Sequence, residues 1–219
     1  LLQCSRNAGV KRFVHASTGS VYGEPMLFPT NENHPRNPVS FYGNSKLAGE
    51  NLCHYYYRKF GIDVRSLRYP GLIGWESMPG GGTTDYAVDI FHEAIKNRNY
   101  TCFLSENRTL PMMYMDDAIN ATINIMDAPL NSIKIRTSYN LSSLYFSPRE
   151  IEQEIKKYFK DFTVKYEPDY RDDLAKGWPQ SINDDYARKD WGWKPNFNLS
   201  QMVNDIILNL KIKYKEELI

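Results

Sequence analysis

Short apolar runs alternate with longer amphipathic segments in the first part of the chain, which is the pattern of strands followed by helices. Residues 11–17 form a short run before a polar Thr-Gly-Ser sequence, and this favours a buried parallel strand that ends in a loop. Residues 39–60 carry apolar side chains at helical spacing, and Gly61 stands where a helix would end. Residues 62–68 follow at once and predict a second strand.

The same alternation continues to the end of the chain. Further strands are predicted at residues 100–104, 110–114, 137–141 and 163–166. Helices are predicted at residues 84–96, 116–126, 147–159 and 199–216, and the end of a helix at residues 1–10. We expect the aromatic stretch before the last helix to be irregular. Strands that alternate with helices predict an α/β fold around a parallel sheet.

Composition and charge narrow the class of protein. The chain has 219 residues, with 27 Lys plus Arg against 26 Asp plus Glu, so its formal net charge is +1. Nucleic acids and anionic membranes bind clustered excess Lys and Arg, so neither partner is expected. No apolar stretch approaches the roughly 18 to 20 residues that span a bilayer, and residues 1–10 lack the layout of a signal peptide. We therefore expect a soluble intracellular protein.

The spacing of cysteine and histidine gives no sign of a disulfide framework or a metal site. Cys4, Cys53 and Cys102 are odd in number and form no C-x-x-C pair. The four histidines are not paired with one another or with cysteine at metal-ligand spacing. Buried free thiols and chemistry without a metal are therefore expected.

Three places in the sequence carry residues that suit oxidation of an alcohol. They are Ser17 and Thr18 at the end of a strand, Tyr42 and Lys46 one helical turn apart, and residues 69–71 at the end of the next strand. The carboxyl ends of parallel strands share one edge of a sheet, so these residues are expected to converge. An ammonium beside a phenol favours the phenolate, which is a base, and the Thr18 hydroxyl can hold a substrate oxygen.

The Y-x-x-x-K spacing alone is a weak signal, because a chain with 16 tyrosines contains it by chance. Tyr55 and Lys59 form a second copy on the same predicted helix, on a different face. Only the first copy lies where a hydroxyl at a strand end can meet it. We therefore interpret Tyr42 and Lys46 as the functional pair, with a solvated surface pair as the alternative.

Several segments resemble a known family. The runs HASTGSVYGE, FYGNSKLAGE and SLRYPGLIG resemble the extended short-chain dehydrogenase/reductases. A second set of segments resembles, more narrowly, the zinc-independent L-threonine 3-dehydrogenases of that superfamily. These segments are PGGGTTDYAVDIFHEAIKN, LPMMYMDDAINATINIMDAP, YNLSSLYFSP and ARKDWGWKPNFNL. The resemblance covers nearly the whole chain. It implies the C-terminal half of a Rossmann-type doubly wound parallel sheet, plus a smaller α/β substrate-binding region.

The resemblance also implies roles for residues at matching positions. It assigns catalysis to Thr18, Tyr42 and Lys46. It assigns binding of the NAD cofactor to Tyr42, Lys46, Tyr69, Pro70 and Leu72. It assigns substrate binding to Thr18, Tyr42, Gly82, Thr83, Thr84 and Trp178. The implied reaction is oxidation of the 3-hydroxyl of L-threonine by NAD to 2-amino-3-ketobutyrate, which leads towards glycine or aminoacetone.

The glycine-rich residues 79–85 make physical sense as a clamp for a carboxylate. Successive glycines expose backbone N–H groups, and a helix predicted to begin near Thr84 adds its positive end. An amino-acid substrate has a carboxylate to bind there. The alternative is a flexible lid in which Thr83, Thr84 or Asp85 only caps the helix. Trp178 has an alternative role too, as a core residue.

Two other functions remain open. A nucleotide-sugar epimerase or dehydratase has the same Thr, Tyr and Lys, but usually carries an Arg for the diphosphate where this chain has Leu110, with Arg108 two residues earlier. An inactive or merely binding fragment is the second, because no G-x-G-x-x-G follows an early strand. We expect residues 1–76 to be the C-terminal part of an NAD-binding domain whose first half is missing. Residues 77–219 are expected to be mainly substrate-binding, with some segments that return to the Rossmann sheet.

Family members commonly pair through two helices, so the resemblance implies a homodimer through the helix that carries Tyr42. The aromatic residues of HYYYRKF cannot all face one core, which fits such a surface, although exposure to solvent is the alternative. The expected partner is otherwise a small-molecule substrate. The sequence leaves the cytoplasm and the mitochondrial matrix equally open as compartments.

Overall fold

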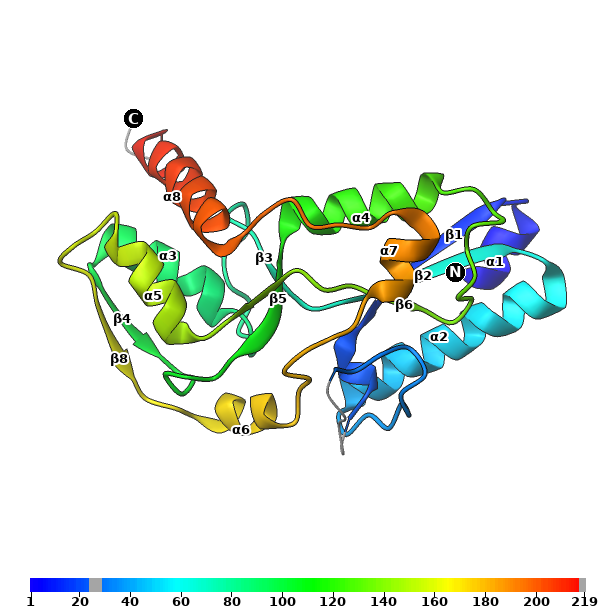
Figure 1. Cartoon of the computed structure of the whole chain (residues 1–219), viewed down its shortest axis with the longest axis horizontal. Helices are drawn as coiled ribbons and strands as arrows, with labels where there is room; N and C mark the ends of the chain where they lie inside the picture. The colour runs from blue at the N-terminus through cyan, green and yellow to red at the C-terminus, as the bar shows by residue number, and fades with distance from the viewer. Residues whose placement is uncertain (24–28, 217–219) are drawn as a thin grey trace. The chain divides into compact units, whose positions relative to one another are not determined.

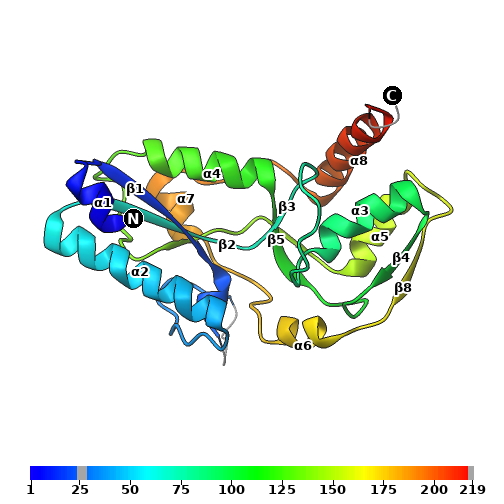
Figure 2. The same ribbon diagram turned by 180° about the vertical axis from the view of Figure 1, so that it is seen from behind.

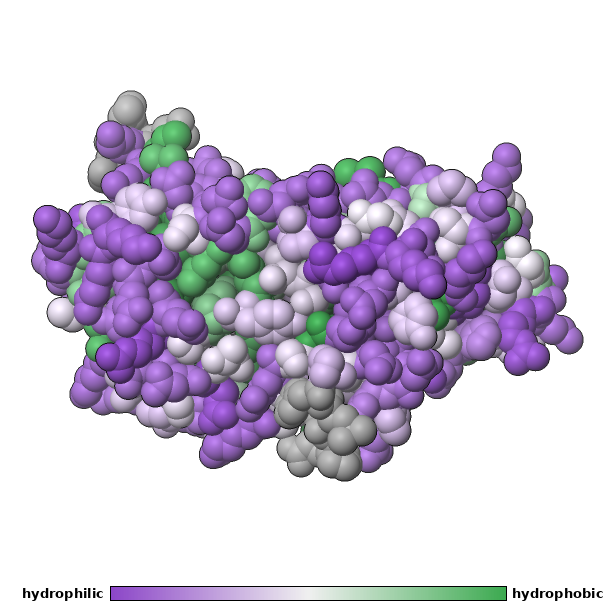
Figure 3. Space-filling model, viewed as in Figure 1, coloured by the Kyte–Doolittle hydropathy of each residue, from purple (hydrophilic) through white to green (hydrophobic). Residues whose placement is uncertain are grey.

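The chain folds into two compact units, each built from segments that are distant in sequence (Figure 1). A computed structural model describes residues 1–23 and 29–216, so Glu24, at the end of one family-like motif, lies outside it. Unit 1 comprises Leu1–Pro70, Asp116–Ser142 and Trp178–Pro195. Unit 2 comprises Gly71–Met115, Ser143–Gly177 and Asn196–Ile219. Polar side chains cover most of the face shown in Figure 3.

Unit 1 contains a parallel sheet with the strand order β1-β2-β6. Its strands are β1 (Arg12–Thr18), β2 (Asp63–Tyr69) and β6 (Tyr139–Asn140). Its helices are α1 (Leu2–Asn7), the short 3-10 helix η1 (Gly19–Val21), α2 (Phe41–Phe60), α4 (Met115–Asp127, from its second residue on) and α7 (Asp185–Trp191). The strand, long helix and second strand predicted at the start of the chain are confirmed. Helices α2 and α4 lie on opposite sides of the sheet (Figures 1 and 2).

Helix α2 has well-defined ends because both of its caps are made by suitable residues. The Ser40 side chain accepts a hydrogen bond from the Gly43 N–H at 3.0 Å. At the other end Gly61 adopts a left-handed conformation with φ of 69°, as predicted for a helix stop. Cys53 on the buried side of α2 packs with Ile62 and Val64, which anchors the helix to the start of β2.

The strand β2 carries two buried arginines, Arg65 and Arg68. Charged side chains are rarely buried unless they are paired, and both of these are. Arg65 is paired with Asp63 at 2.8 Å and donates to the Ala128 carbonyl at 2.7 Å, just after α4. Arg68 pairs with Glu50 of α2. Each arginine therefore connects the sheet to a helix on one of its sides.

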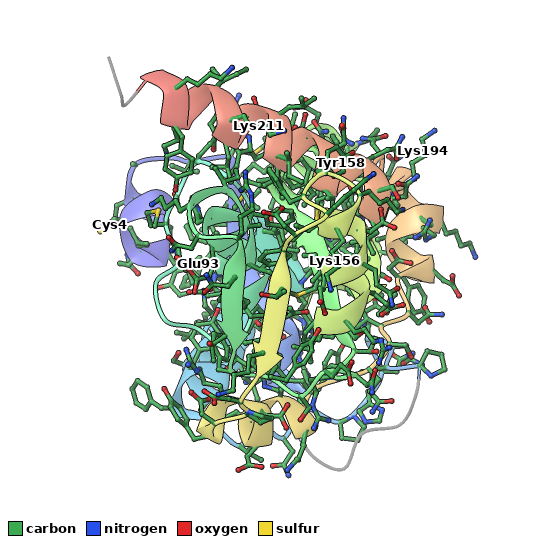
Figure 4. The ribbon with its side chains drawn as sticks, turned by 90° about the vertical axis from the view of Figure 1, so that its left-hand side faces the viewer. Cys4, Glu93, Lys156, Tyr158, Lys194 and Lys211 are labelled. Carbon is green, nitrogen blue, oxygen red and sulfur yellow. The ribbon has the colours of Figure 1, made fainter. Side chains whose placement is uncertain are left out.

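Unit 2 contains a three-stranded sheet and a separate parallel pair. The first sheet has the order β3-β5-β7, from β3 (Gly71–Ile73), β5 (Leu110–Tyr114) and β7 (Leu144–Phe146). The pair joins β4 (Asn99–Cys102) to β8 (Thr163–Tyr166), and Figure 4 shows the two strands side by side. The helices are α3 (Tyr86–Lys96), α5 (Pro148–Lys156), α6 (Tyr170–Lys176) and α8 (Leu199–Glu216).

Several predictions about elements were wrong. The stretch expected to be irregular forms the two seven-residue helices α6 and α7. Strand β7 was not predicted, and it pairs antiparallel with β5, so the strands are not all parallel. The helix predicted at 147–159 ends at Lys156, although its capping box between Ser147 and Glu150 is confirmed.

All three cysteines have free thiols, and Cys53 and Cys102 are buried as predicted. The prediction was wrong for Cys4, which is exposed. No helix in the part of the chain that the structure describes combines the length and apolar character that a membrane crossing needs.

Candidate active site

The carboxyl ends of β1 and β2 meet at one edge of the sheet in unit 1. The parallel register pairs Thr18 directly with Tyr69, so the structure brings together two of the predicted site residues. Thr18 also caps η1, because its Oγ1 accepts a hydrogen bond from the Ser20 N–H at 3.3 Å. The Tyr69 hydroxyl lies 2.5 Å from Thr122 Oγ1 of α4, and burial raises the pKa of Tyr69.

Helix α2 presents Lys46 to the same end of β1. The Lys46 ammonium donates a hydrogen bond to the Ala16 carbonyl at 2.9 Å and lies 5.6 Å from the centre of the Tyr42 ring. Tyr42 is 53% exposed and therefore accessible to a ligand. The structure thus places a phenol, an ammonium and the Thr18 hydroxyl in one unit.

The start of α2 lies close to the loop that follows β1. A Cβ on Gly43 would lie 2.5 Å from the Ser20 carbonyl oxygen and 2.8 Å from Pro38 Cβ, closer than real contacts allow. Glycine is therefore required for the approach of the Tyr42 turn to the Thr18 loop.

The second Y-x-x-x-K copy lies at the other end of α2. The Tyr55 ring makes edge contacts with Tyr56 and Phe60, and both Tyr55 and Lys59 are exposed. The structure therefore places the two copies towards opposite ends of α2.

Sequence reasoning missed a buried carboxylate behind this site. Glu50 accepts hydrogen bonds from Ser17 Oγ at 2.5 Å and from Arg68 Nε and Nη2 at 2.8 and 2.7 Å. Burial would raise the pKa of Glu50, but its bonds to Arg68 and Ser17 outweigh this and lower it. The signal was present, because Tyr42, Lys46 and Glu50 follow one another at intervals of four on a helix.

The glycine-rich segment in unit 2 uses some of its backbone N–H groups internally. Asp85 Oδ2 accepts from the N–H groups of Gly80 and Gly82 at 2.6 and 2.9 Å. Asp85 is also the N-cap residue of α3, but its side chain makes no capping hydrogen bond to that helix. The amides of this segment therefore do bind a carboxylate, which in this structure is the side chain of Asp85.

The remaining predicted site residues are divided between the units. Pro70 ends a segment of unit 1, whereas Leu72 belongs to unit 2, where it pairs with Met113 of β5. Thr83 and Thr84 also lie in unit 2. A Cβ on Gly71 would lie 2.6 Å from Thr84 Cγ2, so the backbone of β3 passes close to the glycine-rich segment.

Trp178 is half-buried and lies in unit 1, together with Thr18. The segment that follows it packs beside the Thr18 loop, because a Cβ on Gly19 would be 3.6 Å from Ile182 and 4.0 Å from Pro179. Hydrogen bonds between Thr30 and the backbone of Ser181 and Asn183 fix this segment. The structure thus brings the neighbourhood of Trp178 to the end of β1.

The position that would carry a diphosphate-binding arginine in an epimerase has no charge. Leu110 is buried in β5. The nearby Arg108 is engaged with Asp172 through two hydrogen bonds of 3.1 and 3.0 Å, and these lower the pKa of Asp172 to about 2. Arg108 is therefore a structural partner of Asp172.

A parallel sheet with a hydroxyl at the end of β1 and a Tyr and Lys one turn apart on the next helix defines a Rossmann-type protein of the short-chain dehydrogenase/reductase class. The chain belongs to the NAD dependent epimerase/dehydratase family, whose model matches residues 1–142. The fold class predicted from the sequence is confirmed.

The chain is similar to proteins named as threonine dehydrogenases. It is 42% identical over 208 residues to the mitochondrial L-threonine 3-dehydrogenase of Bos taurus, covering 94% of this chain and 56% of that protein. It is 47% identical to the holo form of a GalE-like L-threonine dehydrogenase from Cupriavidus necator, with a TM-score of 0.93, covering 95% of this chain and 68% of that one.

An uncharacterized epimerase/dehydratase of Staphylococcus haemolyticus is also 42% identical over 202 residues, covering 92% of this chain and 64% of that protein. The chain therefore spans between about half and two thirds of the length of these curated relatives.

Proposed function

We propose that the protein is an NAD-dependent L-threonine 3-dehydrogenase that oxidises the 3-hydroxyl of L-threonine to 2-amino-3-ketobutyrate. The observation that carries this proposal is the arrangement of Thr18, Tyr42 and Lys46 at the end of β1. Relatives that are 42% and 47% identical and bear this name support the choice of substrate. The product would lead towards glycine or, after loss of carbon dioxide, to aminoacetone.

The donor groups at the sheet edge fit the proposed cofactor. A phenol hydroxyl and an ammonium are suitable donors for the hydroxyls of a ribose, and both Tyr42 and Lys46 stand at the carboxyl edge where dinucleotides bind. Tyr69, Pro70 and Leu72 are proposed to contact its nicotinamide end. When bound, NAD supplies the acceptor for a hydride.

The chemistry of this chain's own residues is proton transfer and orientation. Thr18 donates to or accepts from the substrate hydroxyl and so fixes its oxygen. Tyr42 is proposed to take the hydroxyl proton as the hydrogen on C3 leaves with its electron pair. Lys46, which lies 5.6 Å from the centre of the Tyr42 ring, is proposed to hold the cofactor ribose beside it. The proposed oxidation would leave a ketone at C3, with the hydride on the bound cofactor, and the proton taken by Tyr42 would pass to solvent.

A small zwitterion suits the rest of the proposed site better than a nucleotide sugar. Thr83 and Thr84 are proposed to supply backbone and hydroxyl donors for its carboxylate, joined by Gly82 when its N–H is released from Asp85. Trp178 is proposed as a further substrate-binding residue. A diphosphate would need a free arginine, but Arg108 is held by Asp172 and Leu110 carries no charge. This pair of observations favours threonine over a UDP-sugar.

The exposed side of α2 is proposed as a homodimer surface, because Phe41, Leu52 and Tyr55 are each more than half exposed. Sedimentation of the purified chain would show this as a dimer. A monomer over the working range of protein concentration would refute it. The name of the Bos taurus relative makes the mitochondrial matrix, beside the cytoplasm, a compartment to examine by fractionation.

An assay of NADH formation with L-threonine and NAD tests the proposed activity. The same preparation is offered UDP-glucose and UDP-glucuronic acid, and sugar products are followed by chromatography. NADH from threonine alone supports the proposal, whereas turnover of a sugar without NADH from threonine supports an epimerase. Titration with NAD separates a third case, since failure to bind at micromolar concentration identifies an inactive fragment.

A further inference from the structure

One buried carboxylate connects the three segments that carry the proposed catalytic and cofactor-binding residues of unit 1. Glu50 lies on α2, two turns after Tyr42 and one turn after Lys46. Its hydrogen-bond partners include Ser17, the residue before Thr18, and Arg68, the residue before Tyr69. The mechanism proposed above assigns no role to this residue.

The hydrogen bonds to Glu50 hold its carboxylate in one orientation. Arg68 donates to both carboxylate oxygens of Glu50, at 2.8 and 2.7 Å, which is the bidentate arrangement that restricts rotation. Ser17 donates to Oε1 at 2.5 Å, and Arg36 donates to Oε2 at 3.3 Å. The side chains of Glu50 and Arg68 are fully buried, so solvent does not compete for these bonds.

The hydrogen bonds of Glu50 also fix the orientation of side chains in the candidate active site. Successive residues of a strand point to opposite faces of the sheet, so holding Ser17 against α2 fixes the direction of Thr18. On the same helix face Lys46 donates to the carbonyl of Ala16, the residue before Ser17. Lys46 and Glu50, which lie one turn apart on α2, therefore bind to two neighbouring residues of β1.

We propose that Glu50 is a positioning residue, whose carboxylate holds α2 against the ends of β1 and β2 so that Tyr42 and Lys46 face Thr18 in working geometry. This inference rests on the proposed function, because it supposes that these three residues carry out the reaction. Glu50 touches neither substrate nor cofactor, and its effect passes through Ser17 and Arg68.

The main test removes one hydrogen bond to Glu50 and leaves the buried ion pair between Glu50 and Arg68 intact. Ser17→Ala deletes the hydroxyl that donates to Glu50. The matched control is Ser66→Ala, because Ser66 is also a buried serine of the same sheet, bonded at 2.9 Å to Ser138 and not to Glu50. We expect Ser17→Ala to lower kcat about tenfold or more, with the KM for L-threonine nearly unchanged, because small misplacements of reacting groups slow chemistry strongly. Ser66→Ala should retain the kcat of the unaltered protein.

A second measurement does not depend on turnover. Lysine acetylation by a limiting N-hydroxysuccinimide ester is followed by peptide mass spectrometry, with Lys59 at the far end of α2 as the internal reference. Ser17→Ala and Glu50→Gln are expected to raise the labelling rate of Lys46 severalfold relative to Lys59, because its bond to Ala16 loosens. If Glu50→Gln does not fold, because Arg68 is left buried without its partner, Ser17→Ala decides the matter.

The outcomes separate this inference from the proposed function. Lower kcat and faster Lys46 labelling in Ser17→Ala, but not in Ser66→Ala, support positioning. Equal losses in both serine variants, or unchanged labelling of Lys46, overturn it, because Glu50 would then only stabilise the fold. If the unaltered protein does not oxidise threonine but Lys46 labelling still responds, the proposed substrate is wrong while Glu50 still positions Lys46.

Discussion

At the scale of single residues, the site depends on the surroundings of each side chain more than on its type. Tyr42 and Tyr55 lie on one helix and each precedes a lysine by four residues, yet only Tyr42 lies near the end of β1. The Lys46 bond to the Ala16 carbonyl shows which copy of the motif belongs to the sheet edge.

Replacement of Tyr42 by Phe should therefore remove the proton acceptor without disturbing the fold. We expect kcat for threonine oxidation to fall by about 10² to 10⁴, the usual contribution of general acid–base catalysis. Tyr55→Phe is the matched control, and its kcat should equal that of the unaltered protein. Equal activity in Tyr42→Phe would refute the assignment of Tyr42 as the base.

Asp85 offers a second test at this scale, because its carboxylate occupies two amides of the proposed carboxylate clamp, those of Gly80 and Gly82. Asp85→Asn keeps an oxygen for the N–H groups of Gly80 and Gly82 but removes a charge that repels the substrate carboxylate, so the KM for L-threonine should fall. Asp85→Ala releases the segment and should raise the KM. Steady-state assays at saturating NAD distinguish the two. The same KM in both variants would show that the clamp lies elsewhere.

At the scale of elements, the sequence predicted β1, α2 and β2 well because each has a local signal: apolar runs, a Ser cap and a stop at Gly61. Helices α6 and α7 escaped prediction because each is only seven residues long and shows little periodicity. The contact between Tyr139 and Trp191 shows that α7 instead packs on β6, far away in sequence.

The site was predictable to the same extent. Thr18, Tyr42 and Lys46 follow from a strand end and a helical spacing, both of which are local. The bonds among Glu50, Ser17 and Arg68 arise only when α2 packs on the sheet, and sequence spacing does not reveal a bond between residues 33 positions apart. The Asp85 contact was missed because a loop conformation decides it.

The approach of α2 to the Thr18 loop can be tested through Gly43. In Gly43→Ala the added methyl group meets the Ser20 carbonyl, so the helix must shift, at a cost of about 1 to 3 kcal/mol in stability. We expect a lower melting temperature and a lower kcat. Ala48→Gly, an exposed change on the same helix, should cost about 0.5 to 1 kcal/mol and leave kcat unchanged. A Gly43→Ala protein with full kcat would show that the close approach is dispensable.

At the scale of the whole molecule, acid stability depends on carboxylates that are ionised in the fold. The pKa of Asp172 is about 2 in the fold, held down by its bonds to Arg108, burial notwithstanding, against about 3.9 in an unfolded chain. Because the folded pKa is the lower one, this group stabilises the fold above about pH 4, and the effect is lost as pH falls towards 2.

Melting temperatures of the unaltered protein and of Asp172→Asn, measured from pH 6 to pH 2, test this linkage. The unaltered protein should be the more stable at pH 6, and the difference should shrink between about pH 4 and pH 2. Comparison of the two proteins cancels the titration of other carboxylates. A difference that stays constant with pH would show that the Asp172 bonds do not depend on its charge.

The division of the chain into interleaved segments bears on how the protein is made and altered. Unit 1 is completed only by Trp178–Pro195, so its sheet and helices cannot all assemble on the ribosome until most of the chain has been synthesised. A single cut cannot yield either unit alone. Anyone who wishes to exchange one unit with that of a relative must therefore transplant three separate segments together, with every junction between them kept in place.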